Sequence, residues 1–193
     1  MRYPGMERAY AGDEPPGLLT GDELLRMPWL NPCELVGGRV IRMTPTNPTH
    51  GRIEVNVAAA LRRFARSQKL GIVMAGEVGV FTSRNPDTVR APDVLFLSHE
   101  RDAARTRRDG FLDVAPELVV EILSPTDRRD EVQRKLREYF AAGVRVAWVV
   151  DPAERVVRVH AAHGEPRRFA AGDVLSGGTT LPGFELPVDE VFE

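Results

Sequence analysis

The stretch that decides the fold is Leu118-Val-Val-Glu-Ile-Leu123, a run that is apolar except for Glu121. A short run that is apolar at both odd and even positions is typical of a central strand covered on both faces. Gly and Pro punctuate the chain before and after this run and separate it from its neighbours. The stretch therefore predicts a buried strand in the middle of a sheet, with one carboxylate inside it.

Helices are predicted on either side of this strand along the chain. Apolar residues recur at helical spacing from His50 to about Lys69, which predicts a first long helix. A second helix is predicted from about Arg128 to Ala142, because Gly143 suits the position that follows a helix end. The accompanying predicted strands are Ile72–Thr82, Val89–Ser98, Glu117–Leu123 and Val144–Val150. This order predicts a mixed α/β (α+β) fold, a sheet flanked by helices.

The N-terminal part is expected to be less regular. Residues 1–19 carry several Gly and Pro with little periodicity, which predicts a loose arm. Thr20, with Glu23 three residues later, predicts the start of a short helix that stops near Pro28. Two strands are predicted around Gly37-Gly38, because glycine pairs of this kind favour tight turns.

The length of 193 residues suits one domain. We expect a single domain over residues 20–193, with its core at about 50–152 and extra β pieces at both ends, including short strand-like segments over 155–193. Hydrophobic residues make up 42% of the chain and charged residues 28%, as in an ordinary globular protein.

The sequence shows neither a membrane span nor a secretory signal. No apolar run approaches the length that a span requires, and the N-terminus lacks an apolar run flanked by Lys or Arg. The lone cysteine, Cys33, excludes an internal disulfide and a cysteine-based zinc site. We therefore expect a cytoplasmic protein with no membrane contact.

The formal net charge of −2 does not indicate a nucleic-acid binder, since many such domains are strongly basic. Each arginine cluster is interpreted either as a local basic surface or as a solvated helix face or loop. The three clusters are Arg62, Arg63 and Arg66; Arg101, Arg105, Arg107 and Arg108; and Arg128, Arg129, Arg134 and Arg137.

Two carboxylates, Asp93 and Glu121, fall inside predicted apolar strands. A charged group within a central strand is unfavourable unless it is paired or bound to a cation. One such residue alone is more simply interpreted as a buried salt bridge to an arginine, or as a side chain at an exposed strand end. Two of them on neighbouring strands, followed by a helix that carries a lysine, favour a functional site.

That lysine is Lys135, one of only 2 lysines beside 24 arginines. Because the two cations are not interchangeable, the rare lysine suggests that a compact ammonium is required there. On a helical wheel Lys135 flanks the apolar stripe that faces the sheet, so it could reach over the sheet edge. The alternative interpretation is a surface lysine paired with Glu131, one turn earlier.

Taken together, these segments resemble the Uma2 family over residues 34 to 190. The segments that carry the resemblance are Glu34-Leu-Val-Gly-Gly-Arg, His50-Gly-Arg-Ile, Met74–Glu77, Arg90-Ala-Pro-Asp93-Val, Pro116-Glu-Leu-Val-Val-Glu121-Ile-Leu-Ser-Pro125, Lys135-Leu-Arg-Glu-Tyr139, Gly143-Val with Trp148-Val-Val-Asp151-Pro152, and Leu181-Pro-Gly-Phe184. The family is assigned to the PD-(D/E)XK nucleases. The resemblance therefore implies a restriction-endonuclease-like fold and a metal-dependent endonuclease that hydrolyses phosphodiester bonds in DNA.

The resemblance implies an active-site core of Asp93, Glu121 and Lys135. The literal superfamily motif would place a lysine at position 123, where this chain has Leu123; Uma2-like members supply it from the following helix. Mg²⁺ or Mn²⁺ suits phosphodiester hydrolysis and prefers oxygen ligands. We expect Asp93, Glu121 and the backbone carbonyl of Ile122 to hold the ion, and Lys135 to orient the water or stabilise charge on the phosphate.

Two further residues are candidates for the same site. Glu77, in the strand predicted before Asp93, is a candidate metal ligand, and His50 is a candidate contact to substrate or metal. A strand-end glutamate and a capping or surface histidine are the commoner interpretations.

DNA is the partner that the resemblance implies, and we expect a homodimer, because cutting both strands of a duplex is simplest with two related sites. One alternative is a nuclease-fold module that binds nucleic acid or serves in assembly without catalysis. The other is an RNA-directed nuclease or a different metal-dependent hydrolase. Schemes based on a serine or cysteine nucleophile fit poorly, because Ser124 precedes Pro125 and Cys33 has no evident partner.

Overall fold

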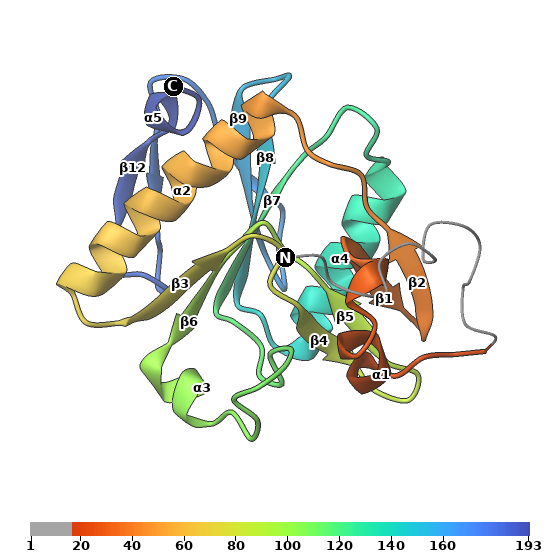
Figure 1. Ribbon diagram of the computed structural model, residues 1–193. Helices are drawn as coiled ribbons and strands as arrows, with labels where there is room; N and C mark the ends of the chain where they lie inside the picture. The colour runs from red at the N-terminus through yellow and green to blue at the C-terminus, as the bar shows by residue number, and fades with distance from the viewer. Residues whose placement is uncertain (1–16) are drawn as a thin grey trace, which may run out of the picture.

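The centre of the fold is a six-stranded sheet, seen in a computed structural model that describes residues 17–193 (Figure 1). The strand order is β10-β9-β8-β7-β6-β3. These strands are β3 (Gly71–Ala75), β6 (Val94–Ser98), β7 (Leu118–Ile122), β8 (Val146–Asp151), β9 (Val156–Ala161) and β10 (Arg167–Phe169). Strand β7 is parallel to β8 and antiparallel to β6, and all of its residues are buried. The prediction of a central strand covered on both faces is confirmed.

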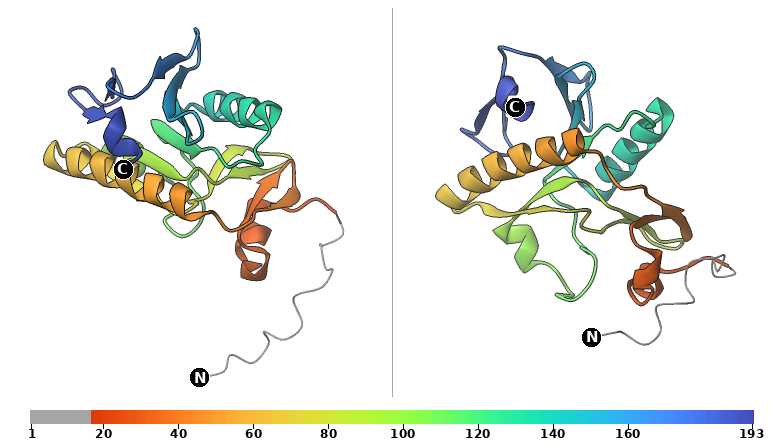
Figure 2. Two further views of the ribbon diagram at one scale, coloured as in Figure 1. Left: turned by 90° about the horizontal axis from the view of Figure 1, so that it is seen from above. Right: turned by 45° about the horizontal axis from the view of Figure 1, so that its top comes forward.

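Helices α2 (Pro48–Ser67) and α4 (Arg129–Ala142) cover opposite faces of this sheet (Figure 2). Val120 of β7 belongs to the apolar cluster under α2, whereas Val119 belongs to the cluster under α4. Because successive side chains of a strand point to opposite faces, Glu121 lies on the α4 side. The predicted fold class, a mixed sheet flanked by helices, is confirmed.

The C-terminal segment completes the layer that contains α2. The hairpin of β11 (Val174–Ser176) and β12 (Glu185–Pro187) and the short helix α5 (Val188–Val191) contribute to the same apolar cluster as α2. Helix α3 (His99–Ala103) follows β6 and lies against β3 and β6. Of the described helices, none has the length and apolar character needed to cross a membrane.

A second sheet, of four strands in the order β2-β1-β5-β4, lies beside the first (Figure 1). Its strands are β1 (Cys33–Val36), β2 (Arg39–Arg42), β4 (Val80–Ser83) and β5 (Thr88–Arg90). The hairpin predicted around Gly37-Gly38 is confirmed, since β1 and β2 pair antiparallel across it.

Two of the strand predictions were wrong in one respect. The segments Ile72–Thr82 and Val89–Ser98 each divide into two strands that belong to different sheets. The first break begins at Gly76, whose φ of +86° lies in the left-handed region. The second break contains Pro92, which has no N–H to donate to a ladder. Both breaks turn the chain from one sheet to the other.

The helix ends agree with the local signals. Thr20 and Glu23 form the predicted capping box at the start of α1 (Gly21–Leu25), and a single 3₁₀ turn, η2 (Pro28–Leu30), follows. Gly143 ends α4 with a φ of +103°. Most of the arm predicted over residues 1–19 lies outside the described residues; within them, the Leu19 N–H donates to the Gly38 carbonyl at 2.8 Å.

Two glycine substitutions should affect stability in opposite directions. A Cβ at Gly71 would lie 2.1 Å from the Leu97 carbonyl oxygen across the β3–β6 pair, whereas a Cβ at Gly51 in α2 meets nothing within 4 Å. We expect Gly71→Ala to lower the free energy of unfolding by about 1–3 kcal/mol. Gly51→Ala should raise it by up to about 1 kcal/mol, because alanine favours helix. Urea unfolding of both variants measures this; equal effects would contradict the β3–β6 register.

Candidate active site

Asp93 and Glu121 meet where β6 and β7 run side by side. The Asp93 N–H donates to the Val120 carbonyl at 3.1 Å, and the Asp93 Oδ2 accepts the Ile122 N–H at 2.6 Å. Asp93 lies in the break before β6 and not within the strand, which corrects the prediction, whereas Glu121 lies within β7 as predicted. Together with Ile122 both carboxylates line a cavity of about 260 Å³.

The carboxylate of Glu121 is buried beneath α4. Its Oε1 accepts the Tyr139 hydroxyl at 2.5 Å, and its Oε2 lies 3.0 Å from the Lys135 Nζ. Burial raises the pKa of Glu121 to about 7; Lys135 opposes the rise, and the nearby Asp93 and Glu34 carboxylates add to it. Burial is therefore the main reason that the charged form of Glu121 is disfavoured, and the contact with Lys135 offsets it only in part.

Lys135 points into the site and not into solvent. Its Nζ lies 3.0 Å from Glu121 Oε2 and 3.1 Å from Glu34 Oε1. Burial alone would lower the pKa of Lys135, but the two carboxylates outweigh burial and raise it. The alternative pairing with Glu131 is not observed, because Glu131 pairs with Arg134 at 2.8 Å.

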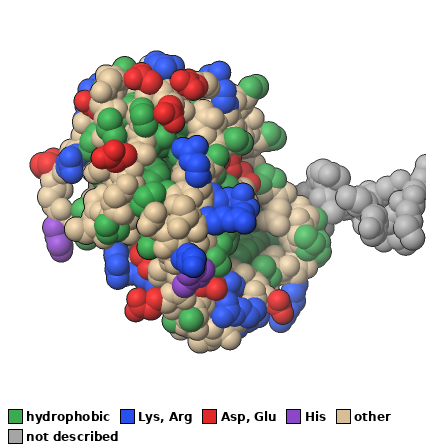
Figure 3. Space-filling view, turned by 90° about the vertical axis from the view of Figure 1, so that its left-hand side faces the viewer, with side chains coloured by type: hydrophobic (Ala, Val, Ile, Leu, Met, Phe, Trp, Pro, Cys, Tyr) green, Lys and Arg blue, Asp and Glu red, His purple; other side chains and the backbone are tan. Residues whose placement is uncertain are grey.

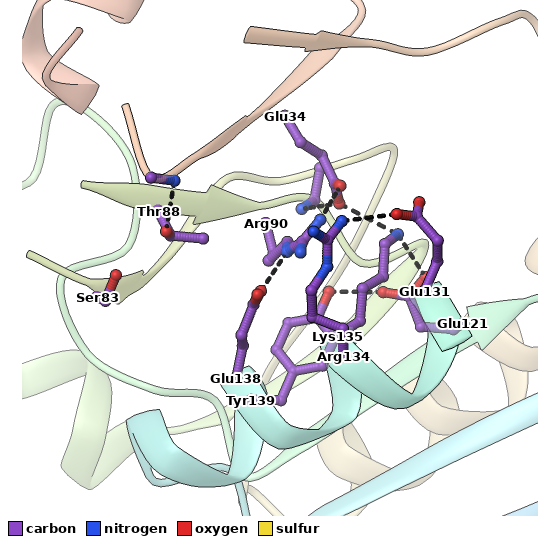
Figure 4. A network of polar contacts seen from close by, with 12 residues as sticks. Glu34, Ser83, Thr88, Arg90, Glu121, Glu131, Arg134, Lys135, Glu138 and Tyr139 are labelled. Carbon is purple, nitrogen blue, oxygen red and sulfur yellow. Dashed lines mark hydrogen bonds and ion pairs between the residues drawn. The ribbon is translucent and has the colours of Figure 1, made fainter. Parts of the chain in front are cut away.

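Glu34 and Arg90 form a buried ion pair behind the lysine (Figure 4). Arg90 Nη1 lies 2.6 Å from Glu34 Oε2, and Arg90 Nε lies 2.5 Å from Glu138 Oε2. Glu34 is 4% exposed and Arg90 is 2% exposed. Burial would raise the pKa of Glu34, but the Lys135 and Arg90 charges lower it below its ordinary value. The sequence offered one signal for this pair, since both residues lie in segments that carry the family resemblance.

His50 lies on the opposite side of Asp93. Its Nε2 is 3.3 Å from Asp93 Oδ1, and its side chain is buried and lines the same cavity. The contact with Asp93 raises the pKa of His50 despite burial. Asn47, not His50, supplies the side-chain cap of α2. The alternative of a capping or surface histidine is therefore excluded, and the Nδ1 atom has no hydrogen-bond partner among the described residues.

Glu77 also lines the cavity, but from a loop. It lies in the break between β3 and β4 with a φ of +56°, which corrects its predicted place in a strand. Glu54, which no sequence motif identified as a site residue, lies one helical turn after His50. Glu54 Oε1 accepts the Gly76 N–H at 3.0 Å, and burial, followed by the Asp93 charge, raises its pKa. The helical spacing from His50 is the signal that could have identified it.

The residues at the site suit a magnesium or manganese ion that is bound by only a few protein ligands. Among residues 17–193, no three His, Cys, Asp or Glu side chains converge into a metal-binding cluster. Mg²⁺ commonly takes one or two carboxylates and keeps several waters. Asp93 and Glu121 offer two carboxylates at one cavity wall, and a bound cation would offset the cost of burying the Glu121 charge, which is the main cause of its raised pKa.

The arginine clusters differ in how far they are neutralised. Arg101, Arg105, Arg107 and Arg108 all pair with acidic side chains, as do Arg128 and Arg134. In the described part of the chain, ion pairs are absent at Arg62, Arg63 and Arg66, which line a shallow hollow on α2. Figure 3 shows the left-hand side of the molecule as it is drawn in Figure 1. Basic and acidic side chains are interspersed over this face.

Comparisons with known proteins bear on the family and the fold of this chain. The Uma2 family model, described as "Putative restriction endonuclease", matches residues 22–189. A solved structure described as "a putative nuclease belonging to DUF820 from Anabaena variabilis" is similar with a TM-score of 0.75 at 22% identity, covering 90% of this chain and 97% of that one. At this identity the likeness supports the fold alone. Comparison with curated proteins finds no match.

The buried Glu121 carboxylate should make stability depend on pH. Its pKa in the fold, about 7, exceeds the ordinary value of 4.5. The stability that this carboxyl group contributes in its protonated form is therefore fully present below pH 4.5 and is lost as pH rises through 7. In metal-free buffer with EDTA, Glu121→Gln should therefore raise the free energy of unfolding at pH 8 by roughly 2–3 kcal/mol. At pH 4 it should change little. Denaturant unfolding at both pH values checks this; an equal difference at both would contradict it.

Proposed function

Because the chain belongs to the Uma2 family, we propose that it is a metal-dependent endonuclease that hydrolyses phosphodiester bonds in DNA. The observation that carries the proposal is the meeting of Asp93, Glu121 and Lys135 at one cavity. Two carboxylates and an ammonium suit the attack of water on an anionic phosphate, where positive charge must be supplied and a nucleophile oriented. The nuclease-like fold and the family model both support hydrolysis of nucleic acid.

We assign the metal ligands to Asp93, Glu121 and the backbone carbonyl of Ile122. When bound, Mg²⁺ or Mn²⁺ would lower the pKa of the attacking water and offset negative charge on the phosphate and the leaving oxygen. The hydrogen bond from the Ile122 N–H orients the Asp93 carboxylate, and the Tyr139 hydroxyl orients that of Glu121. Donors of this kind keep ligands in place before an ion arrives.

The other polar groups of the cavity act on substrate. Lys135 orients the attacking water or stabilises charge that develops on the phosphate oxygens. His50, whose Nε2 lies beside the Asp93 carboxylate, contacts the substrate phosphate or the metal ion from the α2 side. Glu77 is a further ligand candidate at the cavity rim, and Arg42 in the cavity wall is a candidate phosphate contact.

Plasmid cleavage tests this function. We expect wild-type protein to nick supercoiled DNA with Mg²⁺ or Mn²⁺ and not with EDTA. Asp93→Asn, Glu121→Ala and Lys135→Ala should each lower the rate by about 100-fold or more, as expected for groups that act on the transition state.

A matched control is available on the same strand ladder. Glu117 directly precedes β7 and is 3% exposed. Its carboxylate pairs with Ser98 and Arg101, outside the cavity that contains Glu121. Glu117→Gln should leave cleavage intact. If wild-type protein cuts RNA but not DNA with either ion, the DNA assignment is wrong; if it cuts neither, the domain binds or assembles without catalysis.

We further propose that the enzyme acts as a homodimer. The reason is that one site per chain cuts one strand, and two related sites serve both strands of a duplex. Light scattering at assay concentration should give twice the chain mass of 21.4 kDa. A monomeric mass together with intact double-strand cutting would contradict the dimer.

A further inference from the structure

The Lys135 ammonium is shared between carboxylates from two different sheets. Glu121 belongs to β7 of the six-stranded sheet, and Glu34 belongs to β1 of the four-stranded sheet. The Nζ distances, 3.0 Å to Glu121 and 3.1 Å to Glu34, are nearly equal. The ammonium therefore has two alternative partners without any change of its side-chain position.

Glu34 is held far more rigidly than a surface partner would be. Its Oε2 accepts Arg90 Nη1 at 2.6 Å, and its Oε1 accepts the Ala91 N–H at 3.2 Å. Arg90 is fixed in turn by Glu138 of α4. These contacts anchor the Glu34 carboxylate from β5, from the break that follows β5 and, through Glu138, from the helix that carries Lys135 (Figure 4).

The two roles assigned to Glu121 conflict in one respect. A carboxylate that engages a divalent cation has less negative charge to offer an ammonium, and the two cations repel each other at short range. Lys135 is 22% exposed, so without another partner its flexible stem can carry the charge out to solvent. An active-site lysine needs a second acceptor once the metal ligand is occupied.

We infer that Glu34 is a positioning residue that retains the Lys135 ammonium in the site when Glu121 is engaged by a divalent cation. The inference rests on the proposed metal-dependent function. It also makes the N-terminal hairpin part of the active site, although Glu34 lies outside the core that the sequence predicts at about 50–152. Glu34 acts through Lys135 and does not itself contact the substrate.

Mn²⁺ affinity tests the inference without reference to activity. Titration of the full-length protein by calorimetry or Mn²⁺ electron paramagnetic resonance would compare wild type, Glu34→Gln, Lys135→Met and the double variant. Glu34→Gln should weaken Mn²⁺ binding about 10-fold, the usual size for residues behind the ligands. The reason is that Glu121 is then the only carboxylate left to the ammonium, so Mn²⁺ must displace Lys135 from its last partner. In the Lys135→Met background, the same change should have a much smaller effect, because no ammonium remains to be retained.

Glu117→Gln is the matched control. It also removes the charge of a buried carboxylate that pairs with an arginine, Arg101, but Glu117 forms no ion pair or hydrogen bond with Lys135 among the described residues. We expect its Mn²⁺ affinity to equal that of wild type, and thermal unfolding of each variant confirms that it is folded. A loss in Glu117→Gln as large as in Glu34→Gln would show a general structural effect and overturn the inference.

The remaining outcomes separate the inference from the function on which it rests. If Glu34→Gln weakens Mn²⁺ binding equally with and without Lys135, Glu34 acts directly on the ion and the positioning role is wrong. If wild-type protein binds Mn²⁺ but Glu34→Gln binds it equally well, the positioning role is also wrong while the metal site stands. If wild-type protein binds no Mn²⁺, the proposed metal-dependent function falls and the inference falls with it.

Discussion

The carboxylate of Glu121, buried in the central strand of the main sheet, is the constraint on which the arrangement of the site depends. A carboxylate in that position requires donors and countercharge, and α4 supplies both through Tyr139 and Lys135. Lys135 in turn brings Glu34 into contact with the site. The buried charge therefore ties together β7, α4 and the N-terminal hairpin, elements that are far apart in the sequence.

The site lies where the two sheets meet. The chain passes from one sheet to the other at two breaks, one that begins at Gly76 and one that contains Pro92, and these breaks carry Glu77 and Asp93. Residues in such breaks do not follow the regular alternation of side chains in a strand, so their side chains can face a cavity. Asp93 uses this freedom to accept the Ile122 N–H, which joins the break to the strand that carries Glu121.

The electrostatics of the site lower stability at neutral pH and suit the proposed function. Burial and neighbouring carboxylates raise the pKa of Glu121, although nearby cations are available. A buried carboxylate with a raised pKa in a cavity is a feature that active sites often share, where stability is often lower than the fold could achieve. Burial of this carboxylate is also the reason that a bound cation would suit the chemistry of the cavity.

Local sequence signals determined the elements and three central site residues. The apolar run of β7, the capping box at Thr20 and the glycine after α4 each depend on neighbours within a few residues, so they could be predicted correctly. Asp93, Glu121 and Lys135 were accessible for the same reason: a charge inside an apolar run, and a rare lysine beside a helical stripe, are visible without a structure.

Only the tertiary structure decided which strands share a sheet and which distant side chains meet. The sequence predicts Ile72–Thr82 and Val89–Ser98 as single strands, because the pairing that divides each segment depends on partner strands elsewhere in the chain. The contact between Glu34 and Arg90 spans 56 residues, and the retention of Lys135 between two sheets follows from their packing. Such contacts arise from the closing of long loops around the core, for which sequence periodicity carries no signal.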